Sequence, residues 1–166
     1  MQFPVFVILS KNTPDVVKAI EQLMAPYDVE RSVPPYRADI TDEDKAFIAE
    51  YYGLSLDDPG LFEACSRWYE YPCERDERGD YYISADNPEG YWDGWILHDQ
   101  TDVYELPHPS TDSIDPLGIV TPDGIWHEMP YRWDESAEQT AQRRRMVQQF
   151  LTQYPGYLVV LLHCHL

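Results

Sequence analysis

A run of apolar residues near the end of the chain sets the strongest constraint on the fold. The segment YLVVLLHC, residues 157–164, shows no alternation between apolar and polar side chains. A strand with this pattern has both of its faces covered by other parts of the protein. The run is far shorter than the roughly 20 residues that a membrane-spanning helix needs. We therefore expect a fully buried strand of a globular protein here.

The start of the chain predicts a second strand, followed by a helix. The segment FPVFVILS, residues 3–10, is β-rich and bounded by polar residues. The next residues have helical spacing, with Thr13 as a candidate cap and Pro14 at the first helical position. Pro26 ends this helix. The chain therefore begins with a strand and a helix.

The last helix precedes the buried strand. Residues 133–157 have an apolar stripe, acids in the first half, and either Asp134 or Ser136 as the cap. The consecutive arginines 143–145 are the only basic cluster of the sequence. We expect these arginines either on a solvated helix face, where the negative end of the helix stabilises them, or on a face that docks on acids of this chain or of a second copy.

The middle of the chain holds shorter elements. Strands are expected at 81–84 and 91–97 and in a hairpin around the Pro-Asp-Gly turn of 117–128, and capped helices at 41–52 and 57–70. With 166 residues, one domain is expected. The pattern indicates the α+β class, as a ferredoxin-like antiparallel sheet with helices on one face. Residues 1–38 and 117–166 would form the framework, and 39–116 a long acidic insertion.

Charge excludes several classes of function. Thirty acids against twelve bases give a net charge of −18. Between Asp39 and Met129 there are 23 acids and 4 bases, a net of −19. Such a chain repels nucleic acid and anionic membranes but attracts basic surfaces. We therefore expect no direct nucleic acid and no membrane partner; the expected partner is a basic protein that itself binds nucleic acid.

The cysteines and the first residues indicate a reducing compartment. The chain has three cysteines, an odd number, without metal-ligand spacing. Its first residues lack the basic region of a secretion signal. Cys65 and Cys73 lie near Arg67 and Arg75 in the sequence, which could lower a thiol pKa, but Cys65 also fits the apolar face of its helix. We expect a soluble cytoplasmic protein.

An aromatic and acidic segment is the main binding candidate. In NPEGYWDGWILHD, residues 87–99, strand alternation would place Tyr91, Asp93 and Trp95 on one face and Trp92 on the other. The rings could form a sheet core, a contact surface for an arginine-rich partner, or both on opposite faces. The expected binding residues combine these rings with nearby acids: Asp76, Glu77, Asp80, Asp86, Glu89, Tyr91, Trp92, Asp93, Trp95 and Asp99.

A rival hypothesis concerns the terminal His-Cys-His. On a strand, His163 and His165 share a face and lie roughly 7 Å apart, a spacing found for two metal ligands. The candidates for a third ligand are His127, His98, Glu128 and Asp99. His127 and Glu128 could also act as an acid–base pair, although adjacent strand residues point to opposite faces. Under this hypothesis the chain is a metal-dependent enzyme. The structural alternative is a polar strand end that binds neither a metal nor another cofactor.

Several short motifs resemble those of a family of small uncharacterised proteins from bacteriophages and actinobacteria. The resemblance rests on APYDVERSVPPY at 25–36, RDERGDYYISADNPEGYWDGW at 75–95, IVTPDGIWHEMP at 119–130 and the terminal CHL. Where that family has GGRW, this chain reads LHDQTD, residues 97–102, and its DCH is here HCH. The resemblance implies a phage or mobile-element setting and carries no mechanism.

Together these observations favour a non-enzymatic, acidic binding protein of phage type. It would occupy a basic, nucleic-acid-handling surface of a bacterial host protein by imitating nucleic acid. A host-defence inhibitor, such as an anti-CRISPR or anti-restriction protein, fits this description. The metal-dependent enzyme is the alternative. An assembly accessory without chemistry, including a homodimer, is a third possibility.

Overall fold

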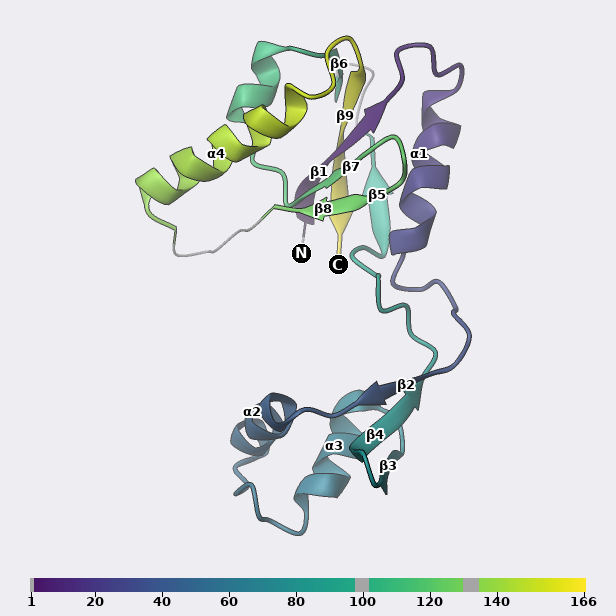
Figure 1. The fold of residues 1–166 in the computed structure, drawn as a ribbon, viewed down its shortest axis with the longest axis vertical. Coiled ribbons are helices and arrows are strands. Elements are labelled where there is room, and N and C mark those ends of the chain that lie inside the picture. Colours follow the sequence, from purple (N-terminus) through teal and green to yellow (C-terminus); the bar gives the residue numbers. More distant parts are fainter. Residues whose placement is uncertain (1, 98–101, 130–134) are drawn as a thin grey trace. The chain divides into compact units, whose positions relative to one another are not determined.

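The computed structural model describes residues 2–97, 102–129 and 135–166. The chain divides into two compact units, which are described separately below (Figure 1). The terminal unit is Met1–Arg31 with Pro88–Leu166, and the inserted unit is Ser32–Asn87. The inserted unit is thus shorter than the acidic segment 39–116 that the sequence indicates.

The terminal unit is built around two long central strands. β1 and β9 pair antiparallel over their whole length, from Gln2 opposite His165 to Leu9 opposite Leu158. The sheet order is β5-β9-β1-β7-β8, and β6 also pairs with β9. The strands are β1 (Gln2–Leu9), β5 (Gly94–Ile96), β6 (Val103–Glu105), β7 (Gly118–Val120), β8 (Trp126–Glu128) and β9 (Leu158–His165).

Two helices cover opposite faces of this sheet. α1 (Val16–Met24) buries Ile20 and Met24 against the odd-numbered residues of β1, such as Val5 and Val7. α4 (Ala137–Leu151) packs with the even-numbered residues of β1 on the other face. Figure 1 shows the two helices on either side of the sheet. The core of the terminal unit therefore has two apolar layers.

The architecture differs in two respects from an antiparallel sheet with helices on one face. β1 and β7 run parallel, with Val5 opposite Gly118, so the sheet is mixed. The helices cover both faces, because β1 and β9 are apolar at consecutive positions and each face needs cover. The α+β class is confirmed: four helices accompany one mixed and one antiparallel sheet in the described residues.

Local side-chain bonds fix where the helices of the terminal unit begin. Asp15, rather than Thr13, caps α1 by accepting a bond from the backbone N–H of Lys18 at 3.0 Å. A short 3₁₀ turn, Ala25–Tyr27, follows α1, and another covers Pro109–Ser113. Ser136 caps α4 in a reciprocal box with Gln139. The alternative cap, Asp134, lies outside the described residues.

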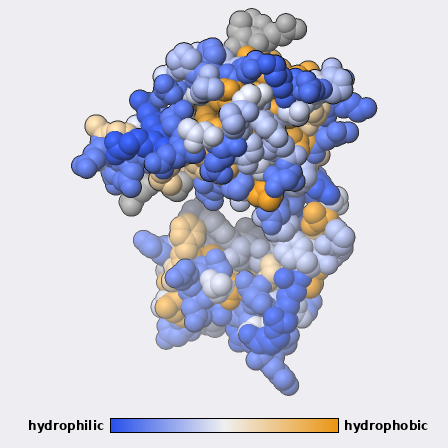
Figure 2. Space-filling model, turned by 45° about the horizontal axis from the view of Figure 1, so that its top comes forward, coloured by the Kyte–Doolittle hydropathy of each residue, from blue (hydrophilic) through white to orange (hydrophobic). Residues whose placement is uncertain are grey.

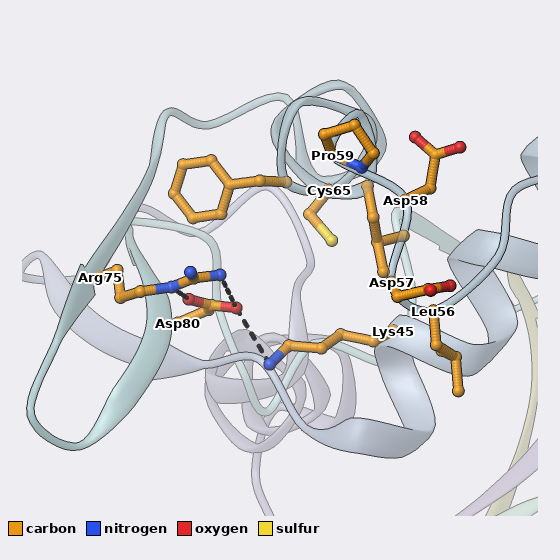
Figure 3. Close-up of a pocket in the computed structure, with 10 residues that line it drawn as sticks. Lys45, Leu56, Asp57, Asp58, Pro59, Cys65, Arg75 and Asp80 are labelled. Atoms are coloured by element: carbon orange, nitrogen blue, oxygen red, sulfur yellow. Dashed lines mark hydrogen bonds and ion pairs between the residues drawn. The ribbon is translucent and has the colours of Figure 1, made fainter.

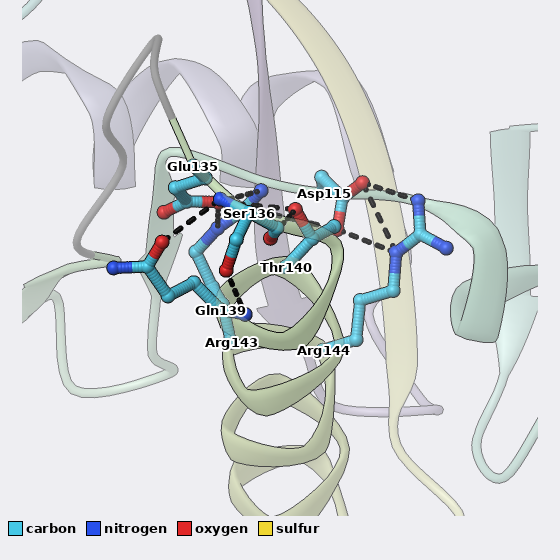
Figure 4. A network of polar contacts seen from close by, with 7 residues as sticks. All are labelled: Asp115, Glu135, Ser136, Gln139, Thr140, Arg143 and Arg144. Atoms are coloured by element: carbon cyan, nitrogen blue, oxygen red, sulfur yellow. Dashed lines mark hydrogen bonds and ion pairs between the residues drawn. The ribbon is translucent and has the colours of Figure 1, made fainter.

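Two arginines of α4 dock on acids of the same unit (Figure 4). Arg143 is only 5% exposed and lies 3.2 Å from Glu135 and 3.4 Å from Asp115. Arg144 makes a two-pronged contact with the carboxylate of Asp115, whose pKa this hydrogen bond lowers. Two members of the basic cluster therefore hold α4 to the chain before β7, as one of the sequence alternatives proposed.

The inserted unit packs two helices against a small antiparallel sheet. Its strand order is β2-β4-β3. Its core contains Ile40, Ile48, Leu61 and Cys65. The capping box of Thr41 starts α2, and a left-handed glycine ends it. The elements are β2 (Tyr36–Asp39), α2 (Asp42–Tyr52), α3 (Leu61–Tyr69), β3 (Cys73–Asp76) and β4 (Gly79–Ser84).

The face of the molecule drawn in Figure 2 is largely hydrophilic. Figure 2 shows a face on which polar side chains dominate and apolar ones form small separate patches. No helix in the parts of the chain that the structure describes has the length and hydropathy needed to cross a membrane.

Candidate binding surface

The acids and rings expected to bind a partner are divided between the two units. Asp76, Glu77, Asp80 and Asp86 belong to the inserted unit, whereas the residues from Glu89 to Trp95 belong to the terminal unit. Asp99 lies outside the described residues. The charge is divided too. The inserted unit has 14 acids and 5 bases, a net of −9, and the rest of the chain carries the other −9.

Of the four candidate binding acids that lie in the inserted unit, three have partners within it. Asp76 pairs with Arg37, and this hydrogen bond lowers the pKa of Asp76. Asp80 is 7% exposed and pairs with Arg75 and with Lys45, the latter at 2.9 Å. Asp86 accepts bonds from the hydroxyls of Tyr71 and Ser84. These carboxylates stabilise the unit itself, whereas Glu77 is exposed in the turn between β3 and β4.

The three rings of the 87–99 segment lie against one core. Trp92 is buried and donates from Nε1 to the Met24 carbonyl at 3.2 Å. Tyr91 stacks on Trp126, with ring centroids 4.6 Å apart and planes 2° apart. Tyr91 and Trp95 are half-buried against the same apolar layer as Trp92. The expected alternation fails because β5 begins only at Gly94, and Trp92 lies outside it, in an isolated β-bridge with Asp28.

The histidines do not converge on one point. His163 and His165 lie on β9, whereas His127 lies on β8, three strand positions away in the sheet order. That separation is about 14 Å at the usual strand spacing. His165 Nδ1 instead lies 2.9 Å from Asp93 Oδ1. Within the described residues, no three His, Cys, Asp or Glu side chains form a group that could hold a metal ion. His98, like Asp99, lies outside those residues.

Four aromatic side chains form an exposed cluster on the inserted unit that the sequence interpretation missed. We call Phe47, Tyr51 and Tyr52 of α2 and Trp68 of α3 the aromatic cluster. The ring of Trp68 meets Phe47 edge-on, with centroids 5.3 Å apart, and Tyr51 at 5.0 Å. Phe47 is 55% exposed, Tyr51 66% and Trp68 38%. Solvent-facing rings in mutual contact are uncommon away from interaction sites.

The composition of α2 makes this exposure unavoidable. Ile48 and Ala49 are buried against α3, so the face that carries Phe47 must point elsewhere. Phe47 and Tyr51 are four residues apart and lie on one side of the helix. The sequence signal was therefore available: the apolar residues of 47–52 surround the helix instead of forming one stripe.

Carboxylates accompany the aromatic cluster. Glu43 lies one turn before Phe47 and Glu50 one turn after it, so both share its side of α2, and both are exposed. On the other side of the cluster, the guanidinium of Arg67 lies 5.4 Å from the centre of the Tyr52 ring. This contact is a cation–π pair within the chain itself. The surface thus combines exposed rings with negative charge.

A pocket of about 580 Å³ also lies in the inserted unit (Figure 3). The side chains of Lys45, Arg75 and Asp80 form one end of it, and Cys65 faces it from α3. Phe62 of α3 also belongs to its lining. Hydrogen bonds from Arg75 and then Lys45 lower the pKa of Asp80 despite its burial. Burial raises the pKa of the Cys65 thiol, which therefore stays protonated at neutral pH.

Comparisons with known proteins return no relative. No protein-family model, no curated protein sequence and no solved structure matches this chain.

Proposed function

We propose that this chain is a non-enzymatic binding protein that docks on a basic surface of another protein, of the kind that handles nucleic acid. The observation that carries the proposal is the aromatic cluster, which combines exposed rings with the carboxylates of Glu43 and Glu50. Its partner surface would present arginine or lysine side chains.

The chemistry of the cluster suits such a partner. Tyrosine and tryptophan supply much of the binding energy in protein interfaces, because they offer large apolar area at a low entropy cost. A guanidinium gains about 0.5–2 kcal/mol over an aromatic face and more from a nearby carboxylate. The contact of Arg67 with Tyr52 shows the same geometry inside the chain.

The net charge supports the same partner. With 14 acids against 5 bases, the inserted unit repels other acidic proteins and speeds its encounter with basic ones. Basic surfaces of this kind are typical of proteins that bind nucleic acid. The resemblance to phage proteins directs the search to bacterial host proteins, including defence nucleases that a nucleic-acid mimic would block.

The proposal is tested by affinity capture with the full chain as bait. The Phe47→Ser, Trp68→Ser double variant removes two rings of the cluster, and Ile83→Ser serves as the control because Ile83 is an exposed apolar residue on β4. We expect a basic partner that the wild type and the control retain and the double variant loses. Raising the salt from about 50 mM to about 500 mM should weaken capture, since screening shortens the reach of the carboxylates.

Two results would contradict the proposal. One is a partner that the double variant retains as well as the wild type does. The other is a partner whose contact surface is acidic or neutral. Circular dichroism of the double variant, compared with the wild type, establishes that loss of capture does not reflect loss of fold.

A further inference from the structure

The pocket of the inserted unit is separate from the aromatic cluster and shares no residue with it. Its walls come from α2, the following loop, α3 and the β3–β4 hairpin, as Figure 3 shows. Its volume of about 580 Å³ falls in the range of pockets that hold small organic ligands. The lining mixes apolar and charged side chains: Leu56, Leu61 and Phe62 line the same space as five charged residues, namely Lys45, Asp57, Asp58, Arg75 and Asp80.

One end of the pocket carries an excess of positive charge. Asp80 lies between Lys45 and Arg75, so a single carboxylate serves two cations. Arg75 uses Nε and Nη2 for Asp80, which leaves the N–H groups of Nη1 for a further acceptor. The Lys45 ammonium has its nearest acid in Asp80, at 2.9 Å, and its next, Asp42, only at 3.9 Å. Lys45 and Arg75 can therefore bind one further carboxylate in addition to Asp80.

The charged end of the pocket, formed by Lys45, Arg75 and Asp80, disfavours ligand groups of other charge. At that end a cation would meet Lys45 and Arg75, whose one carboxylate, Asp80, is already shared between them. A dianion such as a phosphate monoester would exceed the single surplus charge at that end, and Asp57 and Asp58, which also line the pocket, would repel its two charges more strongly than the one charge of a monocarboxylate. The guanidinium of Arg75 lies 5.3 Å from the centre of the Phe62 ring, so an apolar surface adjoins the charged end directly.

We propose that this pocket binds a small monocarboxylate with an apolar body. The ligand carboxylate contacts Lys45 and the Nη1 group of Arg75, because a guanidinium forms strong charged hydrogen bonds with a carboxylate. The apolar body lies against Phe62, Leu61 and Leu56. This site is independent of partner docking by the aromatic cluster, and either proposal can fail without the other.

The test uses the full-length, ¹⁵N-labelled protein and hexanoate as the probe. Two molecules of matched length, hexylamine and hexanol, serve as ligand controls. We expect hexanoate to shift the amide signals of Lys45, Phe62, Cys65 and Asp80 saturably, with a Kd on the order of 1 mM. Hexylamine and hexanol should leave these signals in place at the same concentrations.

Two variants separate the charge contribution from general binding. Arg75→Gln removes a largely exposed side chain and leaves Asp80 its bond to Lys45, so the fold should persist. It should weaken hexanoate binding about tenfold, the equivalent of one charged hydrogen bond. Arg78→Gln is the matched control, because Arg78 pairs with Asp39 and does not line the pocket. Its affinity should equal that of the wild type.

The proposal is overturned if hexanoate shifts none of these signals, or if hexylamine shifts them equally. It is also overturned if Arg75→Gln binds hexanoate as the wild type does, or if Arg78→Gln loses as much affinity as Arg75→Gln. Should Arg75→Gln unfold, the preference of the wild type for hexanoate over hexylamine decides the question alone.

Discussion

The indole ring of Trp126 lies directly over the α-carbon of Gly118. A Cβ placed on this glycine would come within 2.4 Å of one ring atom and 2.6 Å of another. Trp126 is in turn stacked on Tyr91, so it has little freedom to move away. The two strands of the β7–β8 hairpin depend on this close approach.

Gly118→Ala should therefore destabilise the protein by about 1–3 kcal/mol, the usual cost of overpacking a core. Urea unfolding followed by tryptophan fluorescence measures the change. The control is Gly94→Ala on β5, where a Cβ meets nothing within 4 Å. That substitution should change the free energy of unfolding little. Equal effects of the two alanines would contradict the close contact of Trp126 with Gly118.

Asp80 should make stability depend on pH. Its pKa in the folded protein is lowered below the ordinary 3.8 by Arg75 and Lys45. Its contribution is therefore present above about pH 4 and is lost as the pH falls through the folded pKa. Asp80→Asn should cost about 1–3 kcal/mol at pH 7, and the difference from wild type should shrink on acidification. Urea midpoints across the acid range measure it.

The control for this prediction is Glu77→Gln in the adjacent turn, where the side chain is exposed. Its unfolding midpoint should follow that of the wild type at every pH. A difference between wild type and Asp80→Asn that stays constant down to about pH 2 would contradict the assigned role of the carboxylate.

The aromatic cluster should contribute little to folding. Phe47 is 55% exposed, whereas its neighbour Ile48 is 1% exposed in the core of the inserted unit. Phe47→Ser should therefore change stability by less than about 1 kcal/mol, as most surface substitutions do. Ile48→Ala should cost about 2–4 kcal/mol through the cavity it leaves. Comparable losses measured by thermal or urea unfolding would show that the ring is structural and not reserved for a partner.

The three cysteines should differ in reactivity. Burial raises the pKa of Cys164 to about 12 and raises that of Cys65 as well. Cys73 is only half-buried on β3. A thiol reagent at neutral pH should therefore label Cys73 in the native protein, and Cys65 and Cys164 only after unfolding. Cys73→Ser should abolish native labelling; rapid labelling of this variant would contradict the burial of the other two thiols.

Local signals in the sequence predicted most helices and strands. The capping box at Thr41, the apolar runs of β1 and β9, and the hairpin around the Pro-Asp-Gly turn all appear as expected. The parallel pairing of β1 with β7 did not follow from any local pattern. Strand partners far apart in the chain are chosen by packing over the whole sheet, which a single sequence does not display.

The candidate site was harder to predict than the fold. The acids chosen from the sequence were expected to face a partner, but Asp76 pairs with Arg37, which is distant in the sequence, and Asp80 pairs with Arg75 across the β3–β4 hairpin. Trp92 was chosen as a binding residue because its ring has a large apolar area, but the same property places it in the core. The helix at 41–52 was predicted from the sequence, but no role was assigned to its rings, and Phe47 and Tyr51 are exposed.

The chain enters and leaves the inserted unit at neighbouring points. The Val33 N–H bonds the Ala85 carbonyl at 3.3 Å, and the Tyr91 N–H bonds the Tyr27 carbonyl at 2.7 Å on the terminal side. A segment whose two ends are held together can be excised or exchanged as a cassette, with a short linker closing the gap. Residues 32–87 can thus be transplanted as a unit into another protein. The terminal unit that remains keeps both of its central strands, β1 and β9.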